Sequence, residues 1–205
     1  MDHEYSGRAL ASAKAGAPRH WLALTMSCAL FAGAPWATGA PPAPTAAAQR
    51  DGQHDFDFNF GVWKTHIKRV VDPFSGSGES FEMNGTVTVR KVWGGRAQLE
   101  EIAADGPKGH WEGLTLFLYN PTAHQWSQAF ADAKQGMVGS PLIGEFRNGR
   151  GELYSGDTFK GRAILVRGTW SDIQPNFHRY TESYSADGGA TWAPAFIADL
   201  TRLSP

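Results

Sequence analysis

The chain has 205 residues, a formal net charge of −1 and a single cysteine, Cys28. A near-neutral chain without a basic stripe lacks the electrostatic footprint of a nucleic-acid-binding protein. One cysteine excludes a disulfide within the chain and any site built from several thiolates. The composition, with 24 glycines, 12 phenylalanines and 8 tryptophans, favours sheets and turns.

The first 48 residues are typical of an export signal followed by a linker. Three basic side chains within residues 1–20 precede the uncharged apolar run Trp21–Ala32, and small residues and prolines follow it. This order describes a secretory signal peptide, and the run is too short for a good transmembrane helix. We predict a signal peptide and linker over 1–48, a periplasmic or secreted protein, and no membrane attachment after cleavage. A lipoprotein attached through Cys28 and an uncleaved tail are alternatives.

From Asp55 onward, apolar and aromatic segments of strand length recur about every ten residues, with turn signals between them. Several alternate between apolar and polar residues, which indicates strands with one buried face, and none has a sustained helical period. The predicted strands are 60–71, 81–93, 96–104, 111–119, 126–132, 142–146, 151–154, 163–170, 177–185 and 191–203.

The connections between these segments are too short for crossover helices, so neighbouring strands are antiparallel. A meander of about ten strands protects its edges by closing on itself or by splitting into two sheets. We therefore predict an all-β, up-and-down antiparallel barrel over residues 49–205. A two-sheet sandwich is the alternative.

Two motifs lie at opposite ends of the predicted barrel sequence. Gly61-Val62-Trp63 opens the first strand, and Arg202 lies in the last. This combination resembles the calycin signature of lipocalins and fatty-acid-binding proteins. In that family the arginine packs on the tryptophan face and seals one end of the barrel, a cation–π contact. The resemblance implies a structural role for Trp63 and Arg202.

A third motif, Ser185–Trp192, matches the pattern Ser-x-Asp-x-Gly-x-Thr-Trp of the Asp-box. In this hairpin an aspartate caps the turn, glycines supply positive φ angles and a tryptophan packs beneath. The motif occurs once, whereas a propeller would need several similar blades. We expect a structural hairpin in which Asp187 and Trp192 are the key side chains.

Several longer segments share one further resemblance. They are residues 56–63, 112–116, 119–127, 144–154 and 165–173, together with the Asp-box hairpin. Together they resemble a family of bacterial proteins of unknown function with a calycin, lipocalin-like barrel, over about residues 55–203. The resemblance implies the fold and carries no established activity.

Polar side chains within the predicted strands are the candidates for a ligand site. A buried Arg–Glu pair among them would fit a polar or carboxylate ligand, with Trp111, Trp126, Trp170 and Tyr180 as aromatic walls. Structural ion pairs or exposed strand charges are the alternative, and a slip of one residue reverses which side chains face inward. The candidate ligand-binding residues are Glu101, Glu112, Trp126, Arg167, Arg179 and Glu182.

The histidines of the predicted barrel show no metal-ligand spacing, so we predict no metal and no cofactor. Haem-binding barrels of the nitrobindin kind use a late-strand histidine, but we expect His178 to be a half-exposed strand residue. No nucleophile stands beside a recognisable base.

These observations favour an exported barrel that binds a small, partly apolar ligand. One alternative is an isomerase, hydratase or hydrolase that uses Glu101, Glu112 or Arg167. A barrel filled by its own side chains is the other. The sequence leaves the oligomeric state open.

Overall fold

The computed structural model describes residues 50–204. The predicted signal peptide and linker, residues 1–48, lie outside the described residues, so the signal and the location remain predictions. The described part is almost entirely β-structure, with two short 3-10 helices. The elements are η1 (Asp57–Asn59), β1 (Gly61–Val70), β2 (Ser80–Val92), η2 (Trp93–Gly95), β3 (Ala97–Gly106), β4 (Gly109–Asn120), β5 (Gln125–Asp132), β6 (Met137–Val138), β7 (Leu142–Arg147), β8 (Arg150–Phe159), β9 (Arg162–Gln174), β10 (Phe177–Ser185) and β11 (Ala193–Ser204).

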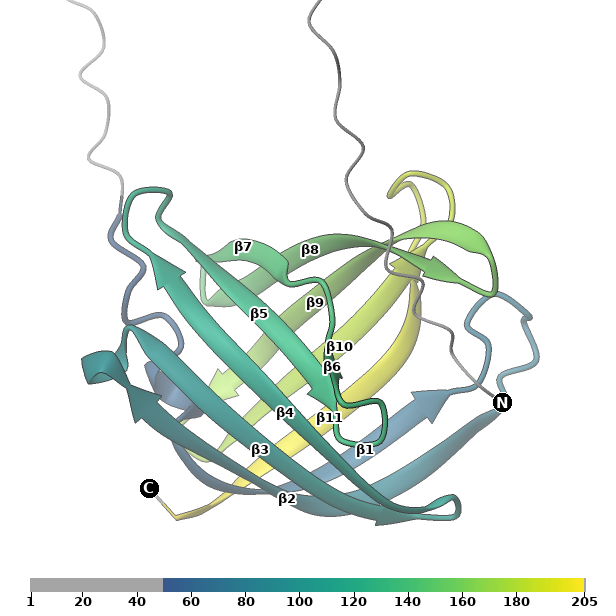
Figure 1. The fold of residues 1–205 in the computed structure, drawn as a ribbon, viewed down its shortest axis with the longest axis horizontal. Helices are drawn as coiled ribbons and strands as arrows, with labels where there is room; N and C mark the ends of the chain where they lie inside the picture. Colours follow the sequence, from purple (N-terminus) through teal and green to yellow (C-terminus); the bar gives the residue numbers. More distant parts are fainter. Residues whose placement is uncertain (1–49, 205) are drawn as a thin grey trace, which may run out of the picture. The chain divides into compact units, whose positions relative to one another are not determined.

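All strands except β6 form one closed antiparallel barrel (Figure 1). Neighbours along the chain pair with each other, β5 pairs with β7, and β1 with β11 completes the ring. The two-residue β6 pairs with β5 alone among the described strands. The predicted all-β barrel is confirmed, and the two-sheet sandwich is wrong because the sheet closes on itself.

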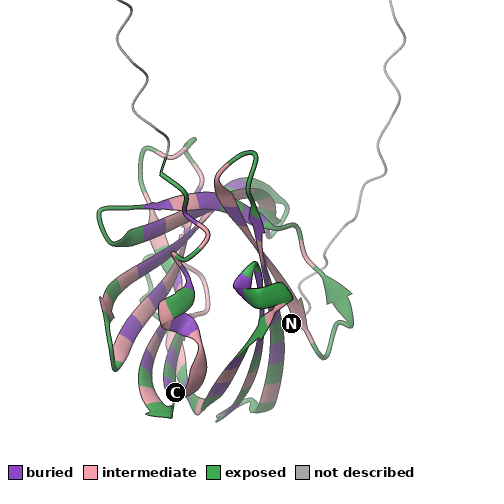
Figure 2. Cartoon of the chain, turned by 90° about the vertical axis from the view of Figure 1, so that its left-hand side faces the viewer, coloured by how far each residue is buried: buried purple, intermediate pink, exposed green. Residues whose placement is uncertain are grey.

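Alternation along the strands separates the inside of the barrel from its outside. On β1, Trp63, Thr65 and Ile67 are buried, whereas Lys64 and His66 between them are exposed. The same banding runs along the other strands in Figure 2. The chemistry of the barrel interior is therefore decided by every second residue of each strand.

Strand β8 differs most from its predicted bounds. We expected residues 151–154, but the strand continues to Phe159 through Ser155–Thr158, a polar run that lacks an apolar alternation. These added residues pair with β9, while the pairing of β8 with β7 stops at Tyr154. Beyond Leu142, no described strand pairs with both β5 and β8, so the ring of hydrogen bonds is interrupted there.

Candidate functional site

One end of the barrel is closed by the segment Arg50–Phe60, which we call the plug. The indole N–H of Trp126 donates to the carbonyl of Gly52 at 2.8 Å, and the side-chain amide of Gln98 donates to that of Phe56 at 3.0 Å. Phe56 is fully buried. Figure 2 looks at this end and shows the short helices lying across it. The plug is thus tied to the barrel by hydrogen bonds to its main chain.

Arg202 lies at the same end. Its guanidinium carbon is 3.9 Å from the centre of the Trp63 ring, and its N–H groups donate to the carbonyls of Phe58 and Phe60 at 2.8 and 2.7 Å. A third N–H reaches the carbonyl of Pro175 at 2.7 Å. The arginine therefore joins the first strand, the last strand and the plug, which is a structural role.

His178 is also part of this sealed end, and its predicted half-exposure is wrong. The side chain is fully buried, with its ring centre 4.3 Å from that of Trp63 and 5.0 Å from that of Phe58. Burial, assisted by the charge of Arg202, lowers the pKa of His178 to about 3. Neither ring nitrogen has a hydrogen-bond partner within residues 50–204. His178 is therefore a neutral packing residue at ordinary pH.

Between the plug and the opposite end, which we call the mouth, polar side chains from several strands face the barrel interior. The Tyr184 hydroxyl donates to Oε1 of Glu182 at 2.9 Å, and the Tyr180 hydroxyl lies 3.5 Å from Oε2 of the same carboxyl. The indole N–H of Trp170 donates to Oε1 of Gln128 at 3.0 Å. We call Glu100, Gln128, Tyr180, Glu182 and Tyr184 the interior cluster.

Gly168 makes space for this cluster. It lies opposite Glu182 in the β9–β10 register, on the inward face. A Cβ atom at this position would lie 2.8 Å from the Tyr180 hydroxyl and 2.9 Å from Leu142 Cδ2. A side chain here would displace the tyrosine, so the glycine is required for the position of the cluster.

Glu100 is the deepest carboxyl of the cluster, with 5% of the residue exposed. It accepts a hydrogen bond from the Thr115 hydroxyl at 2.8 Å, and the Asn59 amide lies 3.5 Å from its other oxygen. Burial raises the pKa of Glu100 to about 7, and these two contacts only partly oppose the shift. The carboxyl thus exchanges its proton near neutral pH.

Glu182 combines depth with solvent contact. Burial raises its pKa, the nearby charge of Asp157 acts in the same direction, and the charge of Arg69 opposes it. The residue is nevertheless only half-buried. The inward-facing Trp111 and Phe196 are half-buried as well, whereas their counterparts at the plug are fully buried. Glu182, Trp111 and Phe196 therefore keep partial contact with solvent.

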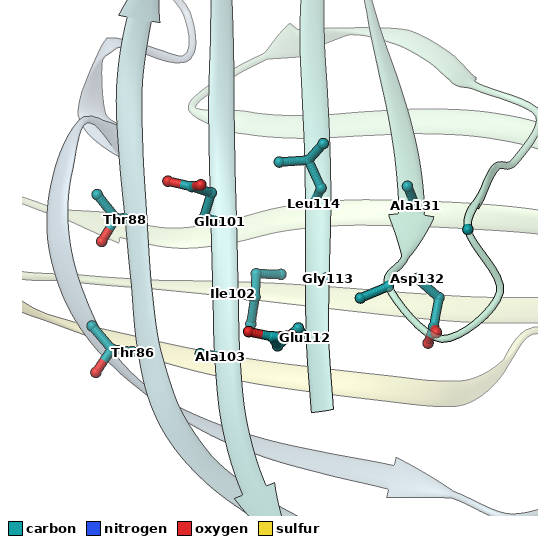
Figure 3. Close-up of a pocket in the computed structure, with 12 residues that line it drawn as sticks. Thr86, Thr88, Glu101, Ile102, Ala103, Glu112, Gly113, Leu114, Ala131 and Asp132 are labelled. Carbon is teal, nitrogen blue, oxygen red and sulfur yellow. The ribbon is translucent and has the colours of Figure 1, made fainter. Parts of the chain in front are cut away.

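The structure divides the predicted ligand-binding residues between the two faces of the wall. Trp126 and Glu182 face the interior, as do the expected aromatic walls. Glu101 and Glu112 lie on the outer face, with side chains 55% and 61% exposed. There they line an open depression of about 470 Å³ together with threonines of β2 (Figure 3).

The two arginines also lie outside the barrel. Arg179 forms an ion pair with Asp199, at 2.5 and 2.8 Å, and Arg167 lies 4.3 Å from the Trp192 ring centre. Arg90 is the ion-pair partner of Glu101. The predicted buried Arg–Glu pair is therefore wrong, because neighbouring residues of a strand point to opposite faces and each arginine fell on the outer one.

Sequence reasoning missed Glu100, Gln128 and Tyr184. Gln128 lies two residues after Trp126, and Tyr184 lies two residues after Glu182, so each shares the face of a predicted residue. Glu100 lies directly before Glu101 and therefore points to the opposite face. Fixing one inward residue per strand would have found them by alternation. The alternation is visible in the sequence, but the sequence does not say which of the two alternating faces points into the barrel.

The Asp-box forms the predicted hairpin at the mouth, between β10 and β11. Asp187 accepts from the main-chain N–H and the hydroxyl of Thr191, at 2.9 and 2.6 Å, and from the hydroxyl of Ser185 at 2.7 Å. Trp192 packs against Tyr154 on the outer face. The hairpin is a structural element that holds the rim beside the ends of β8 and β9.

Residues 50–204 contain neither a metal-binding cluster nor a helix that could span a membrane. Within that range there is no group of three or more His, Cys, Asp or Glu side chains arranged to hold a metal ion. No helix in it is long and apolar enough to cross a membrane.

No family model and no curated protein matches the chain. A solved structure does: the S-type phycobiliprotein lyase from Guillardia theta matches with a TM-score of 0.51 and 11% identity. The match covers 75% of this chain and 93% of the lyase. At that identity the likeness concerns the fold, and it confirms the calycin-like barrel.

Proposed function

We propose that the protein is exported and that its barrel binds a small, partly apolar ligand against the interior cluster. The observation that carries the proposal is Glu182, a carboxyl that lies deep in an aromatic interior and still contacts solvent. Placing a carboxyl inside a protein is unfavourable unless its oxygens are hydrogen-bonded, and only one oxygen of Glu182 accepts a short hydrogen bond, from Tyr184. A barrel that served only as a filled scaffold would gain stability from apolar residues at these positions.

The surroundings of the cluster support a ligand with an apolar body. Trp170 packs 4.8 Å from Tyr180, and Phe196 packs 6.3 Å from the same ring. Trp111 stacks on Phe130 nearer the mouth. Aromatic walls with a few convergent polar groups are the usual composition of small-molecule sites, where the walls supply affinity and the polar groups orientation.

Native mass spectrometry of the protein purified from its own source tests the binding. We expect an adduct of small-molecule mass on the wild-type chain and on a Glu101→Gln variant, whose changed side chain is on the outer face. Glu182→Gln, nearly identical in shape, should lose the adduct. A bare mass for the wild-type protein under gentle conditions would contradict tight binding.

The export part of the proposal rests on the apolar run Trp21–Ala32. Deleting this run should abolish secretion and leave the protein in the cytoplasm, as judged by fractionation and immunoblotting. Normal export of the deleted chain would contradict the predicted signal.

One observation favours a second function, acid–base catalysis on a bound molecule. The pKa of Glu100, about 7, suits a group that gives and takes protons at neutral pH. Under this alternative the molecule bound by the wild-type protein would be converted in time, and a Glu100→Gln variant would retain it unchanged. A stable adduct of constant mass favours binding alone.

A further inference from the structure

We propose that the part of the ligand that reaches the interior cluster is a hydrogen-bond donor, an ammonium or N–H group carried on an aromatic or other apolar body. This rests on the proposed function of the barrel as a ligand-binding protein, and it names the class of ligand. The proposal comes from hydrogen-bond acceptors around Glu100 and Glu182 that lack a full set of donors.

The two interior carboxyls share one pattern of contacts. In each of them Oε1 accepts a short hydrogen bond, from Tyr184 to Glu182 at 2.9 Å and from Thr115 to Glu100 at 2.8 Å. In each of them Oε2 has a contact of only 3.5 Å, at the limit of a hydrogen bond. Since a carboxylate accepts up to about four hydrogen bonds, both groups keep acceptor capacity toward the interior.

Unpartnered buried acceptors beside Glu100 point in the same direction. Oε1 of Gln98 and Oδ1 of Asn59 have no donor within the part of the chain that the structure describes, although both residues are fully buried. The Gln98 amide nitrogen donates to the main chain of the plug, so its oxygen is the free end. Gln98 shares the inward face of β3 with Glu100, and Asn59 contacts that carboxyl. A buried acceptor without a donor is unfavourable, and a donor brought by a ligand would remove that cost.

The charged groups around the interior cluster are mostly acidic, which also favours a donor or a cation. From β3 and β10 come Glu100 and Glu182, and from β8 comes Asp157, whose charge acts on Glu182. Arg69 of β1 is the base whose charge acts on Glu182. An incoming anion would meet two or three carboxyls against one guanidinium, whereas an incoming donor or cation would complete their hydrogen bonds.

Three probes with one ring system test this inference by isothermal titration calorimetry on the full chain. They are 1-naphthylmethylamine, 1-naphthalenemethanol and 1-naphthoic acid, which present a cation, a neutral hydroxyl and an anion. We expect the amine to bind at least tenfold more tightly than the acid. Glu182→Gln should reduce this preference at least tenfold, whereas Glu101→Gln on the outer face should preserve it. Circular dichroism of each variant checks that the barrel is folded, and Tyr184→Phe provides a second, milder change at the same carboxyl.

The outcomes separate the two proposals. If the alcohol or the acid binds as tightly as the amine, and Glu182→Gln leaves the order unchanged, the barrel binds ligands but the donor inference is wrong. If none of the three probes binds, both the donor inference and the binding function are contradicted. A preference for the amine that disappears in Glu182→Gln alone supports both.

Discussion

At the plug, Phe56, Trp63 and His178 are fully buried, whereas toward the mouth Trp111 and Glu182 face the same interior and remain partly exposed. Both regions are built from the inward residues of the same strands. They differ in how their polar groups are satisfied. At the plug, Trp63 and Gln98 donate to main-chain carbonyls, but in the interior cluster Tyr184 and Trp170 donate to other side chains.

The two ends of the barrel are therefore suited to different roles. A hydrogen bond to a main-chain carbonyl fixes the path of the chain, so the plug and Arg202 set the shape of the barrel. A hydrogen bond between two side chains can be exchanged for one to a ligand without moving the backbone. The comparison predicts that changes at the plug alter stability and that changes in the cluster alter binding.

The largest expected effect is at the plug. Phe56→Ala should lower the free energy of unfolding by about 3–5 kcal/mol, because it removes a fully buried ring that packs against several others. Urea denaturation followed by tryptophan fluorescence measures this. Leu203→Ala, at a side chain that is 61% exposed, is the control and should change stability by less than about 0.5 kcal/mol. Equal effects of the two changes would mean that the plug does not stabilise the barrel.

Glu100 should make the protein less stable as the pH rises. Its pKa is 4.5 in the unfolded chain and about 7 when folded, so the folded state holds the extra proton between these values. The stabilisation that this proton contributes is fully present below pH 4.5 and is lost as the pH rises through 7. The free energy of unfolding is then lower by about 3 kcal/mol at pH 8. Glu100→Gln should remove this loss, and the adjacent Glu101→Gln should retain it. Thermal melts across pH 4.5–8 measure it, and an unchanged slope in Glu100→Gln would contradict the buried carboxyl.

His178 should act in the opposite direction at acid pH. The unfolded histidine binds a proton below about pH 6.5, but the folded one does so only near pH 3. Stability is therefore present above pH 6.5 and falls as the pH drops, by about 2 kcal/mol at pH 5. His178→Leu should flatten this acid loss, since neither ring nitrogen has a partner to lose within residues 50–204. Denaturation at pH 5 and pH 7.5 gives the comparison, with exposed His66→Leu as the control.

The smallest expected effect on stability is at Glu182. Glu182→Gln should change the free energy of unfolding by no more than about 1 kcal/mol, because the substitution keeps the shape and removes a carboxyl whose burial is unfavourable. Urea denaturation run beside Phe56→Ala measures it. A loss of unfolding free energy as large as that of Phe56→Ala would contradict this division of roles, because Glu182 would then be a structural residue like those of the plug.

The sequence by itself determined the strands, the turns between them and the meeting of Trp63 with Arg202, since alternation, turn residues and local motifs act over a few neighbouring positions. It also indicated a closed barrel, because a long meander with short connections has unpaired edges to protect. Its main error within the sheet was the polar second half of β8, where inward-facing Ser155 and Asp157 replaced the apolar residues that mark a strand.

The tertiary structure alone decided which residues form the site. Glu100 and Glu101 are adjacent and chemically identical, yet one is a buried carboxyl of the interior cluster and the other is an exposed partner of Arg90. Only closure of the barrel assigns an inside to each strand, and a shift of one residue exchanges the two faces. The hydrogen-bond partners of Glu182 lie two residues away on β10, but those of Glu100 are Thr115 of β4 and Asn59 of the plug. The side chains that meet at Glu100 therefore depend on the β3–β4 register and on the path of the plug, which no local pattern contains.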